Sequence, residues 1–144
     1  MVYVSRVVSP KFIPLHLAIG SRIPMYCTAA GRAYLSALPE QEILLLVAAS
    51  SFVRHTHWTE CDPKRIVDLL KEAKRNVYAY NKEEYFIGDM TVAAPIMGGS
   101  GRPVGAVHVV APTSRWTLKA ACAKLAPSVI EASRGISNAA RAAT

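Results

Sequence analysis

The stretch "TVAAPIMGGSGRPVGAVHVVAP", from Thr91 to Pro112, decides the fold of this chain. Two short runs rich in valine, alanine and isoleucine flank Gly98–Gly101, and this glycine-rich segment is a strong turn signal. Each run has the length and composition of a β-strand. We therefore expect an antiparallel hairpin whose strands cover residues 91–97 and 103–112.

Alternation assigns the side chains of these strands to two faces. One face of each strand carries small or polar side chains: Thr91, Ala93 and Pro95 on the first strand, and Ala106, His108 and Val110 on the second. Asp89 lies just upstream of the first strand. His108 is either a core histidine bonded to a backbone carbonyl, or a donor to the carboxylate of a small ligand that the small neighbours leave room for.

The segments around the hairpin predict further strands and helices. Residues 2–9 and 15–19 alternate in polarity and predict two strands that could pair as a hairpin. Helical spacing predicts three helices: one after Pro24 with Thr28 as its N-cap, one opening at Pro39, and one from Asp62 and Pro63 to about Asn76, a residue suited to the left-handed region.

"VYAY" (77–80) reads as a short strand, and the chain from Ser114 to its end reads as helical, with a kink or a break at Pro127. This order of elements predicts an α+β fold, with a mostly antiparallel sheet of five to six strands flanked by helices. The length of 144 residues fits one domain over residues 1–144.

Composition excludes several classes of protein. The longest apolar run, Ile43–Ala49, is far shorter than the roughly 20 residues that span a bilayer. The N-terminus lacks the layout of a signal peptide, and the odd number of cysteines suits a reducing compartment. We therefore expect a cytoplasmic location and no contact with a membrane. The net charge of +7 comes from scattered basic residues, which favours solvated helix faces over a nucleic-acid footprint.

Patterns for catalysis and metal binding are weak. His55, His57 and Cys61 are potential zinc ligands, but a structural zinc site needs four ligands, so we predict no metal. The chain has neither a nucleophile elbow nor a phosphate-binding glycine loop. We expect no enzymatic activity and no cofactor. The alternative is a small hydrolase or isomerase that uses Asp89 and His108 as base and acid.

The acidic segment Asn81–Ile96 leads into the hairpin. We interpret Glu83 and Glu84 as framework residues that face the surface or pair with a basic neighbour. Asn81, together with Asp89 and Thr91, is predicted to face inward, toward a bound metabolite.

Five motifs in order closely resemble the effector-binding domain of IclR-family bacterial transcriptional regulators: "GSRIPMYCTAAGRAYLSALP", "RHTHWTECDP", "YNKEEYFIGDMTVAAPI", "GRPVGAVHVVAP" and "LAPSVIEASRGIS". The resemblance covers essentially the whole chain. It implies a GAF-like domain that binds a small organic acid, either a carboxylate or an aromatic acid, and associates into dimers or tetramers. DNA would be bound only through an N-terminal winged helix-turn-helix domain, which we expect to be absent from this chain.

The resemblance also implies which residues line the effector pocket: Ile23, Ala29, Ala30, Asn81, Asp89, Thr91, His108 and Val110. Backbone N–H groups near Ala29 would suit an anionic oxygen at a helix start. His108 stands where a small hydroxyl side chain can occur in the family, which favours a carboxylate-bearing, aromatic ligand. The remaining alternative is a purely structural oligomerisation domain whose pocket is vestigial.

Overall fold

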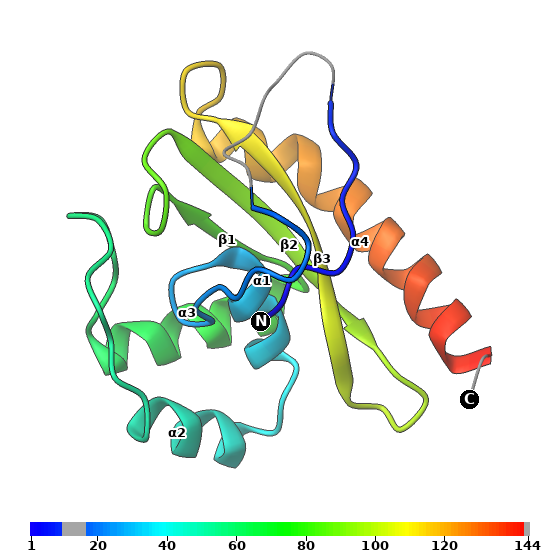
Figure 1. Cartoon of the computed structure of the whole chain (residues 1–144). Coiled ribbons are helices and arrows are strands. Elements are labelled where there is room, and N and C mark those ends of the chain that lie inside the picture. Colours follow the sequence, from blue (N-terminus) through cyan, green and yellow to red (C-terminus); the bar gives the residue numbers. More distant parts are fainter. Residues whose placement is uncertain (10–16, 143–144) are drawn as a thin grey trace.

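The protein is described here by a computed structural model that covers residues 1–9 and 17–142 (Figure 1). The elements in chain order are α1 (Ala29–Ser36), α2 (Glu40–Ala48), α3 (Pro63–Asn76), β1 (Ala79–Lys82), β2 (Asp89–Met97), β3 (Pro103–Pro112) and α4 (Leu118–Ala142). This is the predicted α+β class. Of the five to six strands expected, the described residues form three in one sheet, so the higher number is not confirmed.

The predicted hairpin is confirmed. β2 pairs with β3 in antiparallel orientation, and β1 pairs with the other edge of β2, which gives the order β1-β2-β3. The turn between β2 and β3 uses Gly101 at a positive φ of 74°, a conformation that glycine adopts without steric cost. β2 begins two residues earlier than predicted, at Asp89, so Asp89 belongs to the strand.

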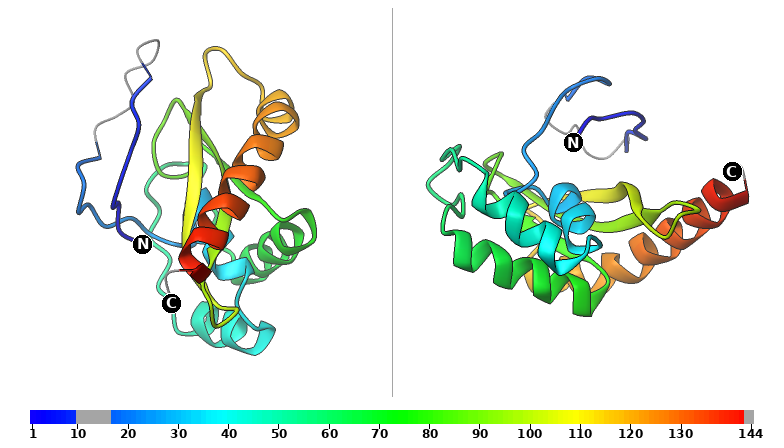
Figure 2. Two further views of the ribbon diagram at one scale, coloured as in Figure 1. Left: turned by 90° about the vertical axis from the view of Figure 1, so that its right-hand side faces the viewer. Right: turned by 90° about the horizontal axis from the view of Figure 1, so that it is seen from below.

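Helices cover both faces of the sheet. α4 packs against β2 and β3 on one face, and α1 packs against all three strands on the other. The N-terminal residues lie on the side opposite α4 (Figure 2). Met90, Val92 and Ala94 are fully or nearly fully buried, and alternation along β2 directs them away from the α1 face.

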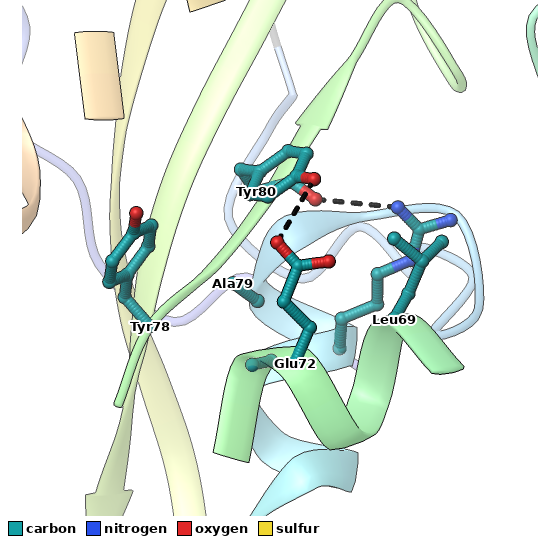
Figure 3. Close-up of a pocket in the computed structure, with 7 residues that line it drawn as sticks. Leu69, Glu72, Tyr78, Ala79 and Tyr80 are labelled. Carbon is teal, nitrogen blue, oxygen red and sulfur yellow. Dashed lines mark hydrogen bonds between the residues drawn. The ribbon is translucent and has the colours of Figure 1, made fainter. Parts of the chain in front are cut away.

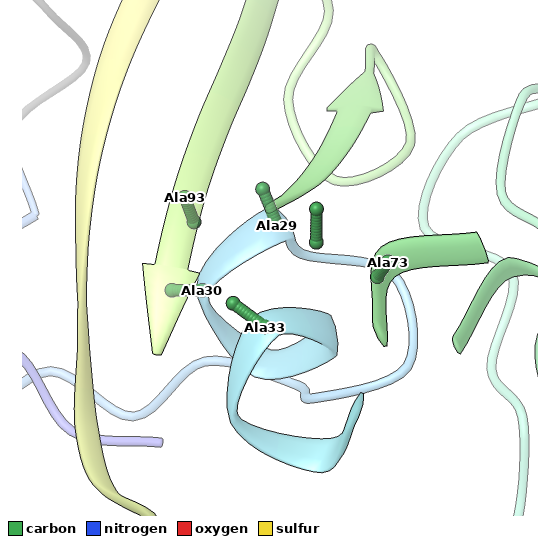
Figure 4. Close-up of a cluster of buried hydrophobic side chains, with 6 residues drawn as sticks. Ala29, Ala30, Ala33, Ala73 and Ala93 are labelled. Carbon is green, nitrogen blue, oxygen red and sulfur yellow. The ribbon is translucent and has the colours of Figure 1, made fainter. Parts of the chain in front are cut away.

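A cluster of alanines joins α1 to the sheet (Figure 4). Ala29, Ala30 and Ala33 of α1 pack with Ala93 of β2, and Ala73 of α3 closes the cluster. Small side chains let the helix backbone come close to the strands, because no large side chain keeps them apart. The start of α1 is therefore held directly above the centre of the sheet.

The predicted starts of α1 and α3 are confirmed, whereas α4 begins at Leu118, four residues after the predicted Ser114. Thr28 caps α1 and accepts a hydrogen bond from Gly31 N at 3.3 Å. Asp62 caps α3 and accepts from Lys64 N at 3.0 Å, with Pro63 in the first turn. Such caps satisfy donors that the first turn of a helix leaves free.

The predicted end of α3 differs by one residue, and at Pro127 the structure excludes one of the two predicted alternatives, the break between two helices. The left-handed residue after α3 is Val77, at φ 64°, whereas Asn76 is still helical. α4 runs without a break through Pro127, so it is one helix. Proline removes a single backbone donor, and the packing of α4 on the sheet keeps the helix continuous.

The predicted strand over residues 2–9 is wrong. Val2 forms one isolated bridge with Arg22, Tyr3 bonds to Gly20 and Ser21, and within the described part of the chain residues 3–9 belong to no strand. Val7 is 99% exposed, because the alternating valines have no second face to pack against. The predicted partner over 15–19 lies partly outside the described residues. In the part of the chain that the structure describes, no helix is long and apolar enough to cross a bilayer.

Candidate functional site

Five of the eight predicted site residues lie on the α1 face of the sheet. In the register of the strands, Asn81 lies opposite Thr91, and Thr91 lies opposite Val110. The next rung on this face holds Ala79, Ala93 and His108, and Asp89 lies at the other end beside Pro112. The register therefore brings Asn81, Thr91, His108 and Val110 to a common face, and alternation in the sequence had already grouped His108 with Val110 on the second strand.

Asn81 is the polar residue that α1 covers most completely. Its side chain is 6% exposed, and its Nδ2 donates to Cys27 O at 3.2 Å, just before α1 begins. Its Oδ1 is buried and accepts no hydrogen bond from any described residue. A buried acceptor without a donor costs free energy, and native proteins keep few of them.

The start of α1 supplies unpaired donors next to Asn81. The first backbone hydrogen bond of the helix is donated by Arg32 N to Thr28 O, and Gly31 N donates to Thr28 Oγ1. No described residue accepts a hydrogen bond from the N–H groups of Ala29 or Ala30. Free N–H groups at a helix N-terminus attract anionic oxygens. That Ala29 and Ala30 line an effector pocket stays a prediction from the resemblance.

Tyr3 joins the site, although the sequence did not mark it. Its hydroxyl is 3.0 Å from His108 Nε2, and the two rings meet edge to face at 5.2 Å between centroids. The backbone of Tyr3 is held by bonds to Ser21 and Gly20. Ile23, the remaining predicted residue, is buried in the same segment, where it bonds to Met1. No local pattern announces a contact across 105 residues of sequence.

Burial governs the protonation of the polar groups on this face. It lowers the pKa of His108 below the ordinary 6.5, so the imidazole is neutral at pH 7. It raises the pKa of Asp89, and it raises the pKa of Tyr3, to which the charge of Asp89 also contributes. A neutral imidazole has one donor nitrogen and one acceptor nitrogen, so His108 can serve either kind of ligand group.

The register separates Asp89 from His108. Asp89 pairs with Pro112, and His108 lies four residues before Pro112 on the same strand. At a rise of about 3.4 Å per residue, the two positions are roughly 14 Å apart along the sheet. At this spacing the two groups do not hydrogen-bond to each other, and each would have to reach a separate atom of a substrate.

The acidic segment has a framework role that was partly predicted. Glu84 pairs with Arg32 through two bonds of 2.6 Å and also accepts from Glu60 N at 3.1 Å. Thr59 Oγ1 donates to Glu84 O, so the loop before α3 is tied to the same residue. Arg32 was not singled out from the sequence, although one arginine in an alanine-rich helix was a usable sign of a buried pair. Glu83 accepts from Gly88 N instead of pairing with a base.

The three residues named as potential zinc ligands, His55, His57 and Cys61, are not gathered into a site among the described residues. His55 packs against the rings of Tyr26 and Tyr85, and His57 lies beside Trp58. Within residues 1–9 and 17–142, no three His, Cys, Asp or Glu side chains are placed to hold a metal ion. Burial raises the pKa of the Cys27 thiol to about 12, which keeps it protonated at neutral pH.

Two hollows lie elsewhere in the structure. The first, beside Arg32, Glu72 and Tyr80, has a volume of about 10 Å³, which holds roughly one water molecule (Figure 3). The second is an open cleft of about 420 Å³ between α4 and the C-terminal ends of α1 and α3, and Lys74, Arg134 and Pro95 are among its lining residues. None of the eight predicted residues lines either hollow.

The chain resembles known proteins along nearly its whole length. Residues 1–138 match the family described as bacterial transcriptional regulator IclR, C-terminal. The Pca operon regulatory protein of Acinetobacter baylyi is 32% identical over 128 residues, which cover 87% of this chain and 45% of that protein. This chain spans less than half the length of the first curated relatives that it matches.

Solved structures share the fold. RHA06195 from Rhodococcus sp. RHA1 superposes with a TM-score of 0.89 at 28% identity, covering 98% of this chain and 56% of that one. The inducer-binding domain of the Acinetobacter transcription factor PobR, solved as a double mutant with 3-hydroxybenzoic acid, superposes with a TM-score of 0.78. Its identity is 19%, and the match covers 90% of this chain and 74% of that one.

Proposed function

We propose, from the premise that this chain belongs to the IclR family of bacterial transcriptional regulators as their C-terminal domain, that it binds a small organic acid on the α1 face of its sheet. The observation that carries the proposal is the meeting of unpaired donors and polar side chains there. The free N–H groups of Ala29 and Ala30 point to a carboxylate. Asn81, Thr91 and His108 lie beneath the same helix.

The eight residues named from the resemblance are our proposed lining of this site. Thr91 and His108 would give directional hydrogen bonds, while Val110 and the alanines would contact an apolar body. The edge-to-face pair of Tyr3 and His108 offers aromatic surface, which suits an aromatic acid. The structure of PobR with 3-hydroxybenzoic acid supports this choice through the fold.

Binding of the acid would regulate transcription through other domains of the whole protein. We propose that a winged helix-turn-helix domain outside these residues binds DNA, and that the acid changes which arrangement of the domains is favoured. Self-association into a dimer or tetramer, the GAF-like character of the domain and a cytoplasmic location belong to the same proposal. The regulatory relatives support a binding role over an enzymatic one.

A thermal-shift panel tests the proposal. Small aliphatic and aromatic carboxylic acids would be added to the purified chain at rising concentration. A ligand that binds only the folded state stabilises it by RT ln(1 + [L]/Kd), so the melting temperature should rise with concentration. Absence of any shift across the panel would contradict acid binding.

Variants connect the shift to the site. His108→Ala and Thr91→Val should each weaken binding at least about tenfold, because each removes one polar contact in a buried site. His57→Ala is the matched control, since His57 is an exposed histidine in the loop before α3. Equal loss of binding in the control would indicate that the acid binds elsewhere.

A further inference from the structure

The amide of Asn81 has a definite orientation. Its nitrogen lies 3.2 Å from Cys27 O, a carbonyl that can only accept. Exchanging the two ends of the amide would bring two acceptors together and lose that bond. Oδ1 is therefore the end that faces away from Cys27, and it is the unpaired end. Among the described residues, it is the one buried side-chain polar atom without a partner.

In the described part of this region, the groups without a hydrogen-bond partner are one acceptor, Asn81 Oδ1, and two donors, the N–H groups of Ala29 and Ala30. Cys27, to which the amide is bonded, is only two residues before Ala29. The amide that carries the unpaired acceptor is thus bonded to the segment that leads directly into the unpaired N–H groups of Ala29 and Ala30 (Figure 4 shows Ala29 and Ala30 at the start of α1 against β2). A ligand that satisfies all three groups needs an anionic acceptor and, near it, a donor.

We infer that Asn81 selects for acids with a hydroxyl group next to the carboxylate, namely 2-hydroxy carboxylic acids. The inference rests on the acid-binding function proposed above and gives the ligand class for the same site. The carboxylate would accept from Ala29 and Ala30, and the hydroxyl hydrogen would go to Asn81 Oδ1. A 2-oxo acid presents a carbonyl oxygen there, which would face the amide oxygen as a second acceptor. An unsubstituted acid would leave Oδ1 unpaired.

The burial of Asn81 determines how much more tightly a 2-hydroxy acid should bind than an acid without the hydroxyl group. Asn81 is more than nine-tenths buried, so bulk water does not replace a missing donor at low cost. One net hydrogen bond in such a place corresponds to about a tenfold difference in Kd. The 2-oxo acid should bind most weakly, because it adds repulsion between acceptors to the missing bond.

Matched ligands on the unmodified chain give the first test. Isothermal titration would compare mandelate, phenylglyoxylate and phenylacetate, which share the aromatic ring and carboxylate and differ at the neighbouring carbon. Lactate, pyruvate and propionate form the aliphatic set. The hydroxy acid of at least one set should bind about tenfold more tightly than both its partners. Equal binding within both sets would overturn the inference while acid binding itself stands.

The variant Asn81→Leu gives the second test. Leucine has the same branched arrangement of heavy atoms and no acceptor, so the hydroxy acid should lose its advantage and bind within about threefold of the unsubstituted acid. His57→Ala should keep the full preference. Persistence of the preference in Asn81→Leu would also overturn the inference, since another acceptor would then read the hydroxyl.

The outcomes separate the two proposals. If Asn81→Leu fails to fold, the ligand sets on the unmodified chain still decide the inference. If none of the six acids binds, the proposed acid-binding function loses its support as well, and the selectivity of Asn81 falls with it. Only binding with the hydroxyl preference supports both.

Discussion

The guanidinium of Arg32 in α1 holds both carboxylate oxygens of Glu84 at 2.6 Å inside the protein. Arg32 also donates to Tyr26 O and Tyr80 O, so its donors join three segments of the chain. This pair fastens the helix that carries Ala29 and Ala30 to the strand that carries Asn81. The candidate site therefore depends on an ion pair that lies outside it.

Breaking this pair should destabilise the fold strongly. Arg32→Met or Glu84→Leu leaves one buried charge without a partner, and each should lower the free energy of unfolding by about 3–5 kcal/mol. The double variant should lose much less than the sum of the two, because no charge is then left alone. Urea unfolding of the four proteins measures this. Arg102→Ala, which breaks the exposed pair with Glu42, should cause little change, and additive losses in the double variant would contradict coupling.

Gly31 should tolerate no side chain. A Cβ at this position would lie 2.3 Å from Met25 Cα and 2.4 Å from Met25 O, and backbone atoms cannot move aside as a side chain does. We expect Gly31→Ala to lower stability by about 1–3 kcal/mol or more.

Gly135 is the matched control for this glycine. It also lies inside a helix, but no atom lies within 4 Å of an added Cβ. Gly135→Ala should raise the free energy of unfolding by about 1 kcal/mol through helix propensity. Thermal or urea unfolding gives both values, and the same sign for both substitutions would contradict the close approach at Gly31.

Val77 should be a position where glycine stabilises. It ends α3 at φ 64° and ψ 11°, where the Cβ of an L-residue is crowded and costs about 1–2 kcal/mol. Val77→Gly should therefore raise stability by about 1 kcal/mol in chemical unfolding. Val53 is also an exposed valine, and its φ is not positive. Val53→Gly should give no gain, and a gain of equal size there would argue against strain at Val77.

His108 should make stability depend on pH on the acidic side. Its pKa is lowered by burial, so below the ordinary value of 6.5 the unfolded chain binds a proton that the folded chain resists. Stability should then fall as pH decreases from 6.5 toward the lowered pKa, and rise again as pH returns to 7.5.

Melting temperatures between pH 7.5 and 5 would show this fall, and His108→Gln should reduce it. Asp89 acts in the opposite direction, since its raised pKa makes ionisation unfavourable in the folded state as pH rises. Asp89→Asn is therefore the companion variant, and it should leave the histidine step in place. If the melting temperature of His108→Gln fell as much as that of the unmodified chain between pH 7.5 and 5, other groups would be responsible for the pH dependence.

Local patterns predicted the elements whose signals are local. Turn glycines and short apolar runs located β2 and β3, and the caps Thr28 and Asp62 located α1 and α3. The strand expected after Val2 was wrong because alternation predicts a strand only where a sheet is available to pair with it. The left-handed residue at the end of α3 is one position later than predicted, at an exposed valine that no local propensity favours there.

The sequence by itself determined which residues share a face. A period of two along β3 put Val110 on the side of His108, and a period of two along β2 put Thr91 on the side of Ala93, while the register of the hairpin joined the two sets on one face. Only the tertiary structure decided what that face meets. Arg32 reaches Glu84 across 52 residues, and Tyr3 reaches His108 across 105. Asn81 Nδ2 bonds to Cys27 O across 54 residues, and Oδ1 is left unpaired. Such contacts depend on how remote elements pack, and neither periodicity nor propensity encodes the distance between two side chains far apart in the chain.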